Sequence, residues 1–325
     1  MKLKGIRLKW SYLVIVAAVA ALAVVPLFAN RYYLDIAIII GIHTMVTVGL
    51  CLLMGYTGQI SLGQAAFYGM GAYFSAILSK TYGVSPWAAM FIGAAVTGGF
   101  AYSIGIAVLR LRGNYLAMAT LALGIIMNIV FTEAASFTGG QDGITGVPYL
   151  SVGGLVFDTD RGYYYLVWAF CLAALLVSRN IVSSRTGRAL RAIRDSESAA
   201  ESIGINVLQL KAKVFALSAV YASLAGSLLA HYWAAVGPKP FDFLFSIKVV
   251  VMAVVGGLAS VWGAIFGTAT VKILGDWLHE FGEYQVIAFG LMLMIVIVFM
   301  PRGLWVHLRS RVLQWQRRST RRAES

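Results

Sequence analysis

The sequence contains few charged residues. Asp, Glu, Lys and Arg make up 12% of its 325 residues. In a soluble domain the usual share is about 25%. In this chain 60% of the residues are hydrophobic and the mean hydropathy is +0.80. These values exclude an ordinary soluble domain and predict a protein that crosses a membrane several times.

The sequence also lacks the motifs of nucleotide and metal binding. It contains no GxxxxGK[ST] loop, no HExxH and no paired-cysteine spacing. Its only cysteines, Cys51 and Cys171, lie within apolar runs, where a thiol behaves as a small apolar side chain and a structural disulfide is not expected. We therefore expect that this chain binds no cofactor or metal and does not hydrolyse ATP alone.

Positive charge exceeds negative charge, and the formal net charge is +13. The Lys and Arg residues gather in loops and at the two ends, next to apolar runs. This distribution is typical of cytoplasmic loops that face anionic lipid. We interpret the charge as a signal of membrane topology, with lipid rather than nucleic acid as the partner.

Apolar runs occupy most of the chain, and all except one have the length of a single membrane crossing. They lie at about residues 11–29, 33–54, 60–79, 86–109, 115–132, 163–179, 212–235, 246–275 and 285–300. The first run is too long for the core of a signal peptide, so we expect it to be retained. The sequence predicts an all-α fold, a polytopic transmembrane helical bundle over residues 11–300.

Basic residues also set the orientation of this bundle. Four basic segments are expected in the cytoplasm: the N-terminus 1–10, the turn at Arg110 and Arg112, the loop 180–211 and the tail 301–325. The acidic loop 133–162 is expected in the periplasm. Both termini are then cytoplasmic.

Simple alternation of crossings fails after residue 235, because it would leave the basic tail outside. The run 246–275 has 30 residues and would be about 45 Å long as one helix, longer than a hydrocarbon core of about 30 Å. Gly256–Gly257 lies within it. We predict a re-entrant or broken-helix hairpin here, in addition to about eight full spans.

Two glycine-rich segments are candidate walls of a translocation pathway. Broken backbone within a membrane is tolerated where protein or a water-filled path surrounds it. Close helix packing by small residues is an equally good interpretation. The candidate pathway residues are Gly58, Gln59, Ser61, Gly63, Gln64, Gly256, Gly257 and Gly263.

Two histidines, His43 and His231, lie within apolar runs. Either could act as a proton relay in an ion-coupled carrier that works alone. We favour the alternative that each is packed and hydrogen-bonded. A membrane scaffold without transport activity is a third possibility, and it predicts that bulky residues are tolerated in the glycine-rich segments.

The loop 180–211 concentrates charge, since 7 of the 39 charged residues lie in the 22 residues from Arg185 to Asn206. Leu190, Ile193, Ala200 and Ile203 fall along one helical stripe, and Gly204 is placed to end a helix. A solvated loop that only sets topology would need neither feature. We therefore predict one or two amphipathic helices. Their acidic residues favour a protein partner. The candidate docking residues are Arg188, Leu190, Arg191, Ile193, Arg194, Asp195, Glu197, Ala200, Glu201 and Gly204.

Several longer motifs occur in order along the chain. They are GYTGQISLGQAAFYGMGAY, LRGNYLAMATLALG, TGGQDGITGVP, SRTGRALRAIRDSESAAESIGINVLQLKAKVFALSAVYASLAGSLLA and VVGGLASVWGAIFG. Together they resemble the permease subunits of branched-chain amino-acid ABC importers, in particular the LivM-type subunit, over about residues 33 to 303. The resemblance implies translocation of leucine, isoleucine and valine across a bacterial inner membrane by alternating access.

The same resemblance implies partners. Two cytoplasmic ATPase subunits would use ATP and magnesium, a second related permease would complete a heterodimer, and a periplasmic substrate-binding protein would deliver the solute. Arg185 to Asn206 would be the coupling helix, although Glu201 matches the Glu-Ala-Ala loop of such permeases only loosely. Related permeases carry urea, short amides and other neutral amino acids, so these substrates remain alternatives.

Overall fold

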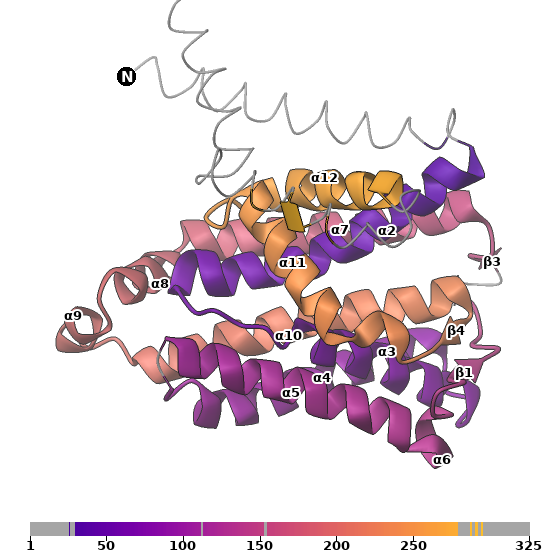
Figure 1. Ribbon diagram of the computed structural model, residues 1–325, viewed down its shortest axis with the longest axis horizontal. Helices are drawn as coiled ribbons and strands as arrows, with labels where there is room; N and C mark the ends of the chain where they lie inside the picture. Colours follow the sequence, from indigo (N-terminus) through magenta and orange to yellow (C-terminus); the bar gives the residue numbers. More distant parts are fainter. Residues whose placement is uncertain are drawn as a thin grey trace, which may run out of the picture.

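The computed structural model describes residues 30–111, 113–152 and 155–278, together with positions 26, 287, 290, 291 and 294. The described part is a bundle of long helices that lie roughly along one axis (Figure 1). Two short helices project at one end of the bundle, which we call the α9 end. Short strands and a helical turn lie at the opposite end, which we call the β1 end.

The long helices follow the apolar runs closely. The long helices are α2 (Arg31–Leu50), which continues as the π-helix η1 (Cys51–Tyr56), α3 (Gln64–Lys80), α4 (Pro86–Val108), α5 (Asn114–Glu133), α7 (Asp160–Ser183) and α10 (Val207–Trp233). The shorter helices are α6 (Ala135–Thr138), α8 (Arg185–Asp195), α9 (Glu197–Ser202), the 3-10 helix η2 (Lys239–Phe241), α11 (Phe243–Gly256) and α12 (Gly263–Leu278). Strand β1 (Ile144–Thr145) pairs antiparallel with β4 (Ala235–Val236), and β2 (Ser151–Val152) with β3 (Leu155–Val156).

Five segments among the described residues are long and apolar enough to cross a membrane: Arg31–Tyr56, Pro86–Val108, Asn114–Glu133, Asp160–Ser183 and Val207–Trp233. The predicted all-α membrane class is therefore confirmed, but the count of eight spans is not. The predicted runs 11–29 and 285–300 lie outside the described residues except at single positions, and the tail 301–325 lies wholly outside them.

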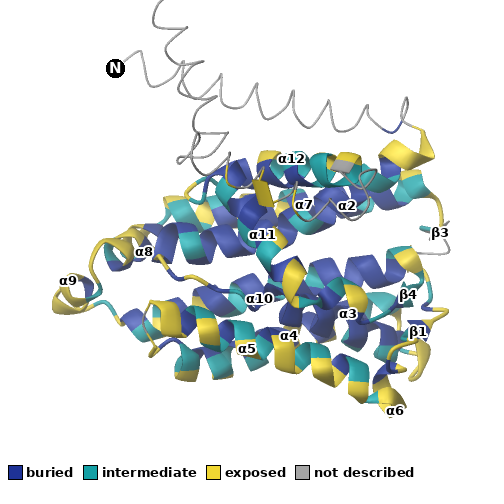
Figure 2. Ribbon diagram, viewed as in Figure 1, coloured by how far each residue is buried: buried dark blue, intermediate teal, exposed yellow. Residues whose placement is uncertain are grey.

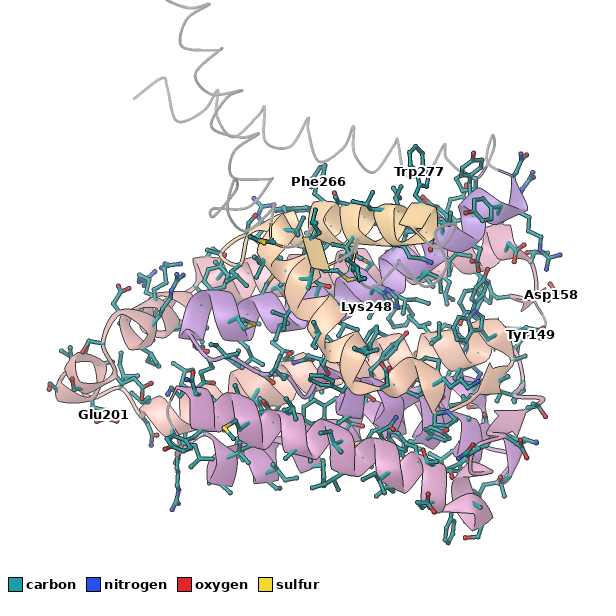
Figure 3. The ribbon with its side chains drawn as sticks, in the orientation of Figure 1. Tyr149, Asp158, Glu201, Lys248, Phe266 and Trp277 are labelled. Atoms are coloured by element: carbon teal, nitrogen blue, oxygen red, sulfur yellow. The ribbon has the colours of Figure 1, made fainter. Side chains whose placement is uncertain are left out.

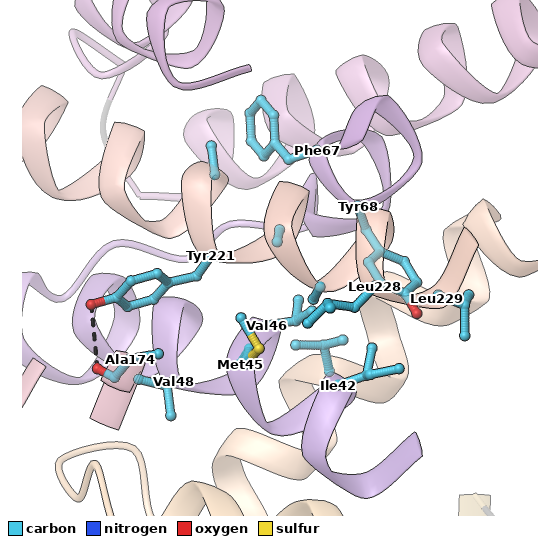
Figure 4. Close-up of a cluster of buried hydrophobic side chains, with 14 of the residues drawn as sticks. Ile42, Met45, Val46, Val48, Phe67, Tyr68, Ala174, Tyr221, Leu228 and Leu229 are labelled. Atoms are coloured by element: carbon cyan, nitrogen blue, oxygen red, sulfur yellow. Dashed lines mark hydrogen bonds between the residues drawn. The ribbon is translucent and has the colours of Figure 1, made fainter. Parts of the chain in front are cut away.

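Helix α10 lies at the centre of the bundle and packs against α2, α3 and α4. Small residues let it approach α3 closely: a Cβ added at Gly226 would overlap the carbonyl oxygen of Tyr68, and one at Gly71 would overlap that of Ser223. Most of α10 is buried (Figure 2). The apolar core beside it includes Ile42 and Met45 of α2 (Figure 4). In a membrane the lipid is as apolar as the helix surfaces, so the hydrophobic effect does not bring helices together. Helices there usually associate through small residues that allow close packing.

The two cysteines belong to this packed interior. Cys51 in η1 and Cys171 in α7 are both buried, and neither forms a disulfide within the described chain. The expectation of two unpaired thiols is confirmed.

Helices α11 and α12 form an antiparallel hairpin in place of one long helix. Helix α11 ends at Gly256, Gly257 has a φ of +102°, and α12 begins at Gly263. A Cβ at Gly256 would overlap the backbone of Gly263, and one at Gly267 would overlap the carbonyl oxygen of Met252. The predicted break at Gly256–Gly257 is confirmed because glycine permits both the unusual φ and the close helix contact. The side of the membrane from which the hairpin enters remains a prediction.

Helix α3 begins partway along the bundle. Gly49 of α2 and Gln64, the first residue of α3, both contact the Ser218 side chain of α10. Gly49 is seven residues before Tyr56, which corresponds to about 10 Å along a helix axis. The segment 57–63 therefore leads back from the α9 end into the bundle. A helix terminus inside the bundle is typical of the broken helices that line transport pathways.

Candidate functional site

Three polar caps shape the element at the α9 end. The Ser184 side chain accepts a hydrogen bond from Thr186 N–H (3.1 Å), Ser196 from Ala199 N–H (3.3 Å) and Asn206 from Gln209 N–H (3.1 Å). Such caps accept hydrogen bonds from backbone N–H groups that have no acceptor within the first turn of a helix. Ser196 has an extended backbone and divides α8 from α9. Gly204, with a φ of +82°, follows the end of α9. The prediction of two short helices with a glycine stop is confirmed.

The apolar stripe of this element faces the permease itself. Leu190 is 0% and Ile193 2% exposed, and Ala200 packs with Ile193 and with Val207 of α10. Ile203 does not belong to this stripe, because it is 73% exposed beyond the end of α9. The predicted placement of Ile203 on the stripe is wrong, since α9 ends at Ser202 and Ile203 no longer follows its helical periodicity.

Charged side chains surround the buried stripe. Glu197 forms an ion pair with Lys211 of α10, and Arg191 Nη1 donates to the Val182 carbonyl oxygen (3.2 Å). These two contacts fix the element to its neighbours. The exposed members of the predicted set are Arg188, Arg191, Arg194, Asp195, Glu201 and Gly204. Glu201 lies at the far tip (Figure 3).

Arg194 connects α8 to the end of η1. Its Nη1 donates a short hydrogen bond to the Gly55 carbonyl oxygen. Gly58, which has a φ of +71°, lies against the same arginine, since a Cβ there would be 3.4 Å from Arg194 Cγ. The predicted docking residue Arg194 and the predicted pathway residue Gly58 are therefore neighbours.

The end of η1 in turn contacts the turn of the α11–α12 hairpin. A Cβ added at Gly55 would overlap the Leu258 carbonyl oxygen, so only glycine allows this approach. The Tyr56 hydroxyl donates to the Ala259 carbonyl oxygen (2.7 Å). We call the contact of Arg194, Gly55, Tyr56 and the turn 257–262 the α8–hairpin junction. A displacement of α8 would reach the hairpin through this junction.

Neighbouring helices hold the link between η1 and α3 in place. Leu62 N–H donates to Thr120 Oγ1 of α5 (3.0 Å), and Gly63 lies against the Thr120 carbonyl oxygen. Gln64 Nε2 donates to Ser218 Oγ (3.1 Å), while Ala65 N–H donates to Ser246 Oγ of α11 (3.0 Å). The start of α3 thus contacts helices α5, α10 and α11.

Gln59 and Ser61 lie within the same link and are buried. Neither side chain has a hydrogen-bond partner within the part of the chain that the structure describes. Buried polar groups usually have partners, so these two are consistent with a polar pathway wall. Their role as pathway residues remains a prediction.

Gly256 and Gly263 have a clear packing role, whereas Gly257 supplies the positive φ of the turn. Gly256 and Gly263 bring α11 and α12 into backbone contact, and Gly263 N–H donates to Ser260 Oγ in the turn (3.0 Å). Close helix packing and a pathway wall are compatible interpretations of these glycines. The close packing itself shapes the hairpin turn at the α8–hairpin junction.

The two histidines differ. His231 Nδ1 is 2.6 Å from the Pro148 carbonyl oxygen and Nε2 is 2.7 Å from Ser75 Oγ. A carbonyl oxygen only accepts, so Nδ1 carries the proton and Nε2 accepts from the serine in a neutral ring. His43 packs edge-on against Tyr68 and Phe245, and its Nδ1 is buried without a partner among the described residues. The interpretation as a hydrogen-bonded packing residue thus holds for His231.

The contacts of Gly55 and Tyr56 with the turn at Leu258 and Ala259 were not predicted from the sequence. Gly55 and Tyr56 are the first residues of the glycine-rich stretch GYTGQ. This stretch is the one feature of the sequence that could have indicated a close contact here. The partner turn is about 200 residues away in the sequence, as the separation of 203 between Tyr56 and Ala259 shows.

Within the described residues, no three His, Cys, Asp or Glu side chains gather in a way that could hold a metal ion.

Comparison with known proteins identifies relatives over most of the chain. A family model described as "Branched-chain amino acid transport system / permease component" matches residues 32–301. The permease protein LivM of the high-affinity branched-chain amino acid transport system is 30% identical over 302 residues in both Salmonella typhimurium and Escherichia coli (strain K12), covering 86% of this chain and 71% of the relative. LivH of the same system in Escherichia coli (strain K12) is 26% identical, covering 81% of this chain and 90% of the relative. No solved structure matches the chain significantly.

Proposed function

Because the chain belongs to the branched-chain amino acid permease family and is of LivM type, we propose that it is the membrane-spanning subunit of an ATP-driven importer in a bacterial inner membrane. It is a multi-pass membrane protein. The proposed solutes are leucine, isoleucine and valine. Transport subunits of this family move solutes rather than catalyse reactions, so the proposed energy source is ATP hydrolysis by separate subunits.

The proposed assembly contains a second permease. Both LivM and LivH are permeases of branched-chain amino acid transport in Escherichia coli, and this chain is similar to each. A LivH-type partner would therefore complete the membrane core. Two cytoplasmic ATPases and a periplasmic substrate-binding protein complete the proposed complex.

The α8–hairpin junction is the observation that carries the proposed mechanism. Arg194 of α8 bonds to Gly55, and the backbone around Gly55 contacts the hairpin turn. In the proposed cycle, ATP binding closes the ATPases, shifts α8 and α9, and moves the hairpin through this junction. Coupling requires contacts that differ between two states. A helix pair held by one turn is a suitable two-state element.

The exposed tip of α9 is the proposed ATPase contact. Leu190 and Ile193 face the permease, so they would hold the element in place rather than touch a partner. Ile203 is exposed next to Glu201 and Gly204. In the proposed complex, Ile203 enters a groove of the ATPase, with the charged residues of α8 and α9 around it.

The test of this function is purification of the tagged chain, co-expressed with its candidate partners, followed by reconstitution into liposomes. We expect two ATPases and a second permease to co-purify, and leucine uptake to require both ATP and the binding protein. Excess isoleucine and valine should suppress that uptake, whereas urea should not. Recovery of the chain alone, with leucine uptake driven by a proton gradient without ATP, would replace this proposal with the carrier that works alone.

A further inference from the structure

An aromatic cluster lies where α2, α3 and α11 meet. Tyr68 of α3 stacks on Phe245 of α11, with ring centroids 4.6 Å apart and an interplanar angle of 11°. Phe241 of η2 meets Tyr68 edge-on at 5.2 Å, and His43 of α2 meets Phe245 edge-on at 5.2 Å. We call these four residues the aromatic site.

The aromatic site contains buried polar atoms. Tyr68 is 0% exposed, and neither its hydroxyl nor His43 Nδ1 has a hydrogen-bond partner among the described residues. The Tyr68 and His43 rings meet edge-on, with centroids 6.2 Å apart. An adjacent tyrosine, Tyr73, stacks on Phe131 and meets Phe241 edge-on, and its buried hydroxyl likewise has no partner within the described chain.

Two other buried tyrosines of the bundle have partners for their hydroxyls. Tyr163 of α7 donates to the Leu228 carbonyl oxygen (2.6 Å), and Tyr221 of α10 donates to the Ala174 carbonyl oxygen (3.3 Å; Figure 4). A buried donor or acceptor without a partner is costly. Two such groups lie on the contacting rings of Tyr68 and His43, so a ligand bound here can supply partners for both.

The aromatic site lies at the middle of the bundle. His43 and Thr44 are the two central residues of the apolar segment Arg31–Tyr56. Tyr68 lies in the first two turns of α3, close to the helix start inside the bundle. A solute that crosses between the two ends of the bundle would pass this level.

We propose that the aromatic site binds the transported solute, a zwitterionic amino acid with an aliphatic side chain; this rests on the proposed function. The faces of Phe241, Phe245 and Tyr68 provide apolar walls for the aliphatic side chain. The Tyr68 hydroxyl can donate or accept, and the His43 ring offers a second polar contact, so the two groups can pair with the carboxylate and ammonium of the ligand.

The hairpin controls access to this site. Phe245 belongs to α11, whose far end leads into the turn that contacts Gly55 and Tyr56. Asp242 caps α11 by accepting from Phe245 N–H (2.9 Å), so Phe245 is fixed to the helix start. Movement of the hairpin through the α8–hairpin junction separates Phe245 from Tyr68. The solute then enters between the Tyr68 and Phe245 rings.

Two tyrosine substitutions, each in the complete complex, test this site. Tyr68→Phe removes a hydroxyl without a partner in the described chain, whereas Tyr163→Phe removes one that donates to Leu228. Binding of radiolabelled leucine to the purified complex without binding protein is measured for both. We expect Tyr68→Phe to weaken leucine binding at least tenfold and leave the melting temperature unchanged or higher. Tyr163→Phe should lower the melting temperature and change leucine affinity less than twofold.

A second variant tests the apolar wall. Phe245→Ala removes the ring that stacks on Tyr68, so we expect competition by phenylalanine against labelled leucine to strengthen several-fold. Wild-type leucine affinity in Tyr68→Phe, or unchanged competition in Phe245→Ala, would overturn the site. If one of these two results is obtained and the wild-type complex still takes up leucine with ATP, the aromatic site is rejected as the binding site and the proposed function is retained. A wild-type complex without ATP-dependent uptake would instead reject the function.

Discussion

Gly55 shows how one missing side chain determines a contact between distant segments. Its backbone lies so close to the Leu258 carbonyl oxygen that any Cβ would overlap it, and its own carbonyl oxygen accepts from Arg194. A larger residue must therefore push the hairpin turn away from η1. The same change would also disturb the Arg194 contact, because both involve one residue.

We predict that Gly55→Ala uncouples ATP hydrolysis from transport. Leucine uptake should fall at least tenfold in liposomes, while the ATPases still co-purify and hydrolyse ATP. Gly99→Ala in α4 is the matched control, since its Cβ would meet no atom of the described chain within 4 Å and alanine favours a helix. Uptake by Gly55→Ala equal to that of Gly99→Ala would show that the α8–hairpin junction does not carry coupling.

His231 is expected to be structural. Replacement by alanine leaves Ser75 and the Pro148 carbonyl oxygen without their partner, which costs about 1–3 kcal/mol for each buried group. We predict a lower melting temperature for His231→Ala, measured by thermal unfolding of the purified complex. Any residual uptake should show the same ratio between pH 6 and pH 8 as the wild type. A selective loss of the pH dependence of uptake would favour the proton-coupled carrier.

The α8–α9 element has one face toward the permease and one exposed tip. Its buried face is held by Leu190, Ile193 and the ion pair of Glu197 with Lys211. Its tip carries the exposed Ile203. Substitutions on the buried face should therefore lower stability, since this face holds the element in place. Substitutions at the tip should instead affect binding of a partner.

We predict that Ile203→Asp abolishes co-purification of the ATPases without lowering the stability of the permease. A charge at the exposed tip removes an apolar anchor but disturbs no internal packing. Leu190→Asp should instead lower the melting temperature, because it places a carboxylate in a fully buried position. Thr186→Asp, exposed at the start of α8, is the control and should retain the ATPases. Full retention of ATPases by Ile203→Asp would place the docking surface elsewhere.

The topology of the whole molecule depends on the hairpin. Because α11 and α12 are antiparallel, the start of α11 and the end of α12 lie on the same side. A single crossing over 246–275 would have placed them on opposite sides. With the run 285–300 as a crossing and the tail 301–325 in the cytoplasm, the hairpin predicts that the turn at Asp276, Glu280 and Glu283 lies outside. Of these three residues, only Asp276 is described.

Cysteine labelling tests this arrangement. We predict that Trp277→Cys, at a position that is 72% exposed, reacts with a membrane-impermeant thiol reagent in intact spheroplasts. Glu201→Cys at the α9 tip should react only after the membrane is opened. Cys51 and Cys171 are buried, so the unmodified chain serves as the control. Reaction of Trp277→Cys only after opening would show that its end of α12 is cytoplasmic.

Local features of the amino-acid sequence determined the class of the protein and several of its elements. Composition indicated a helical membrane protein, and the length of the run 246–275 with Gly256–Gly257 indicated a broken helix. The apolar stripe and Gly204 indicated short helices in the loop 180–211. These features depend on apolar length, helical periodicity and the freedom of glycine at positive φ, all of which act within a few residues.

Only the tertiary structure decided which surfaces meet. It turned Leu190 and Ile193 inward and left Ile203 exposed. It brought Gly55 and Tyr56 against a turn about 200 residues away, and it stacked Tyr68 on Phe245 with the tyrosine hydroxyl left without a partner in the described chain. Such contacts depend on how whole helices pack in space. Helices of similar apolar composition allow many pairings, and only side-chain shape and close backbone approach select among them.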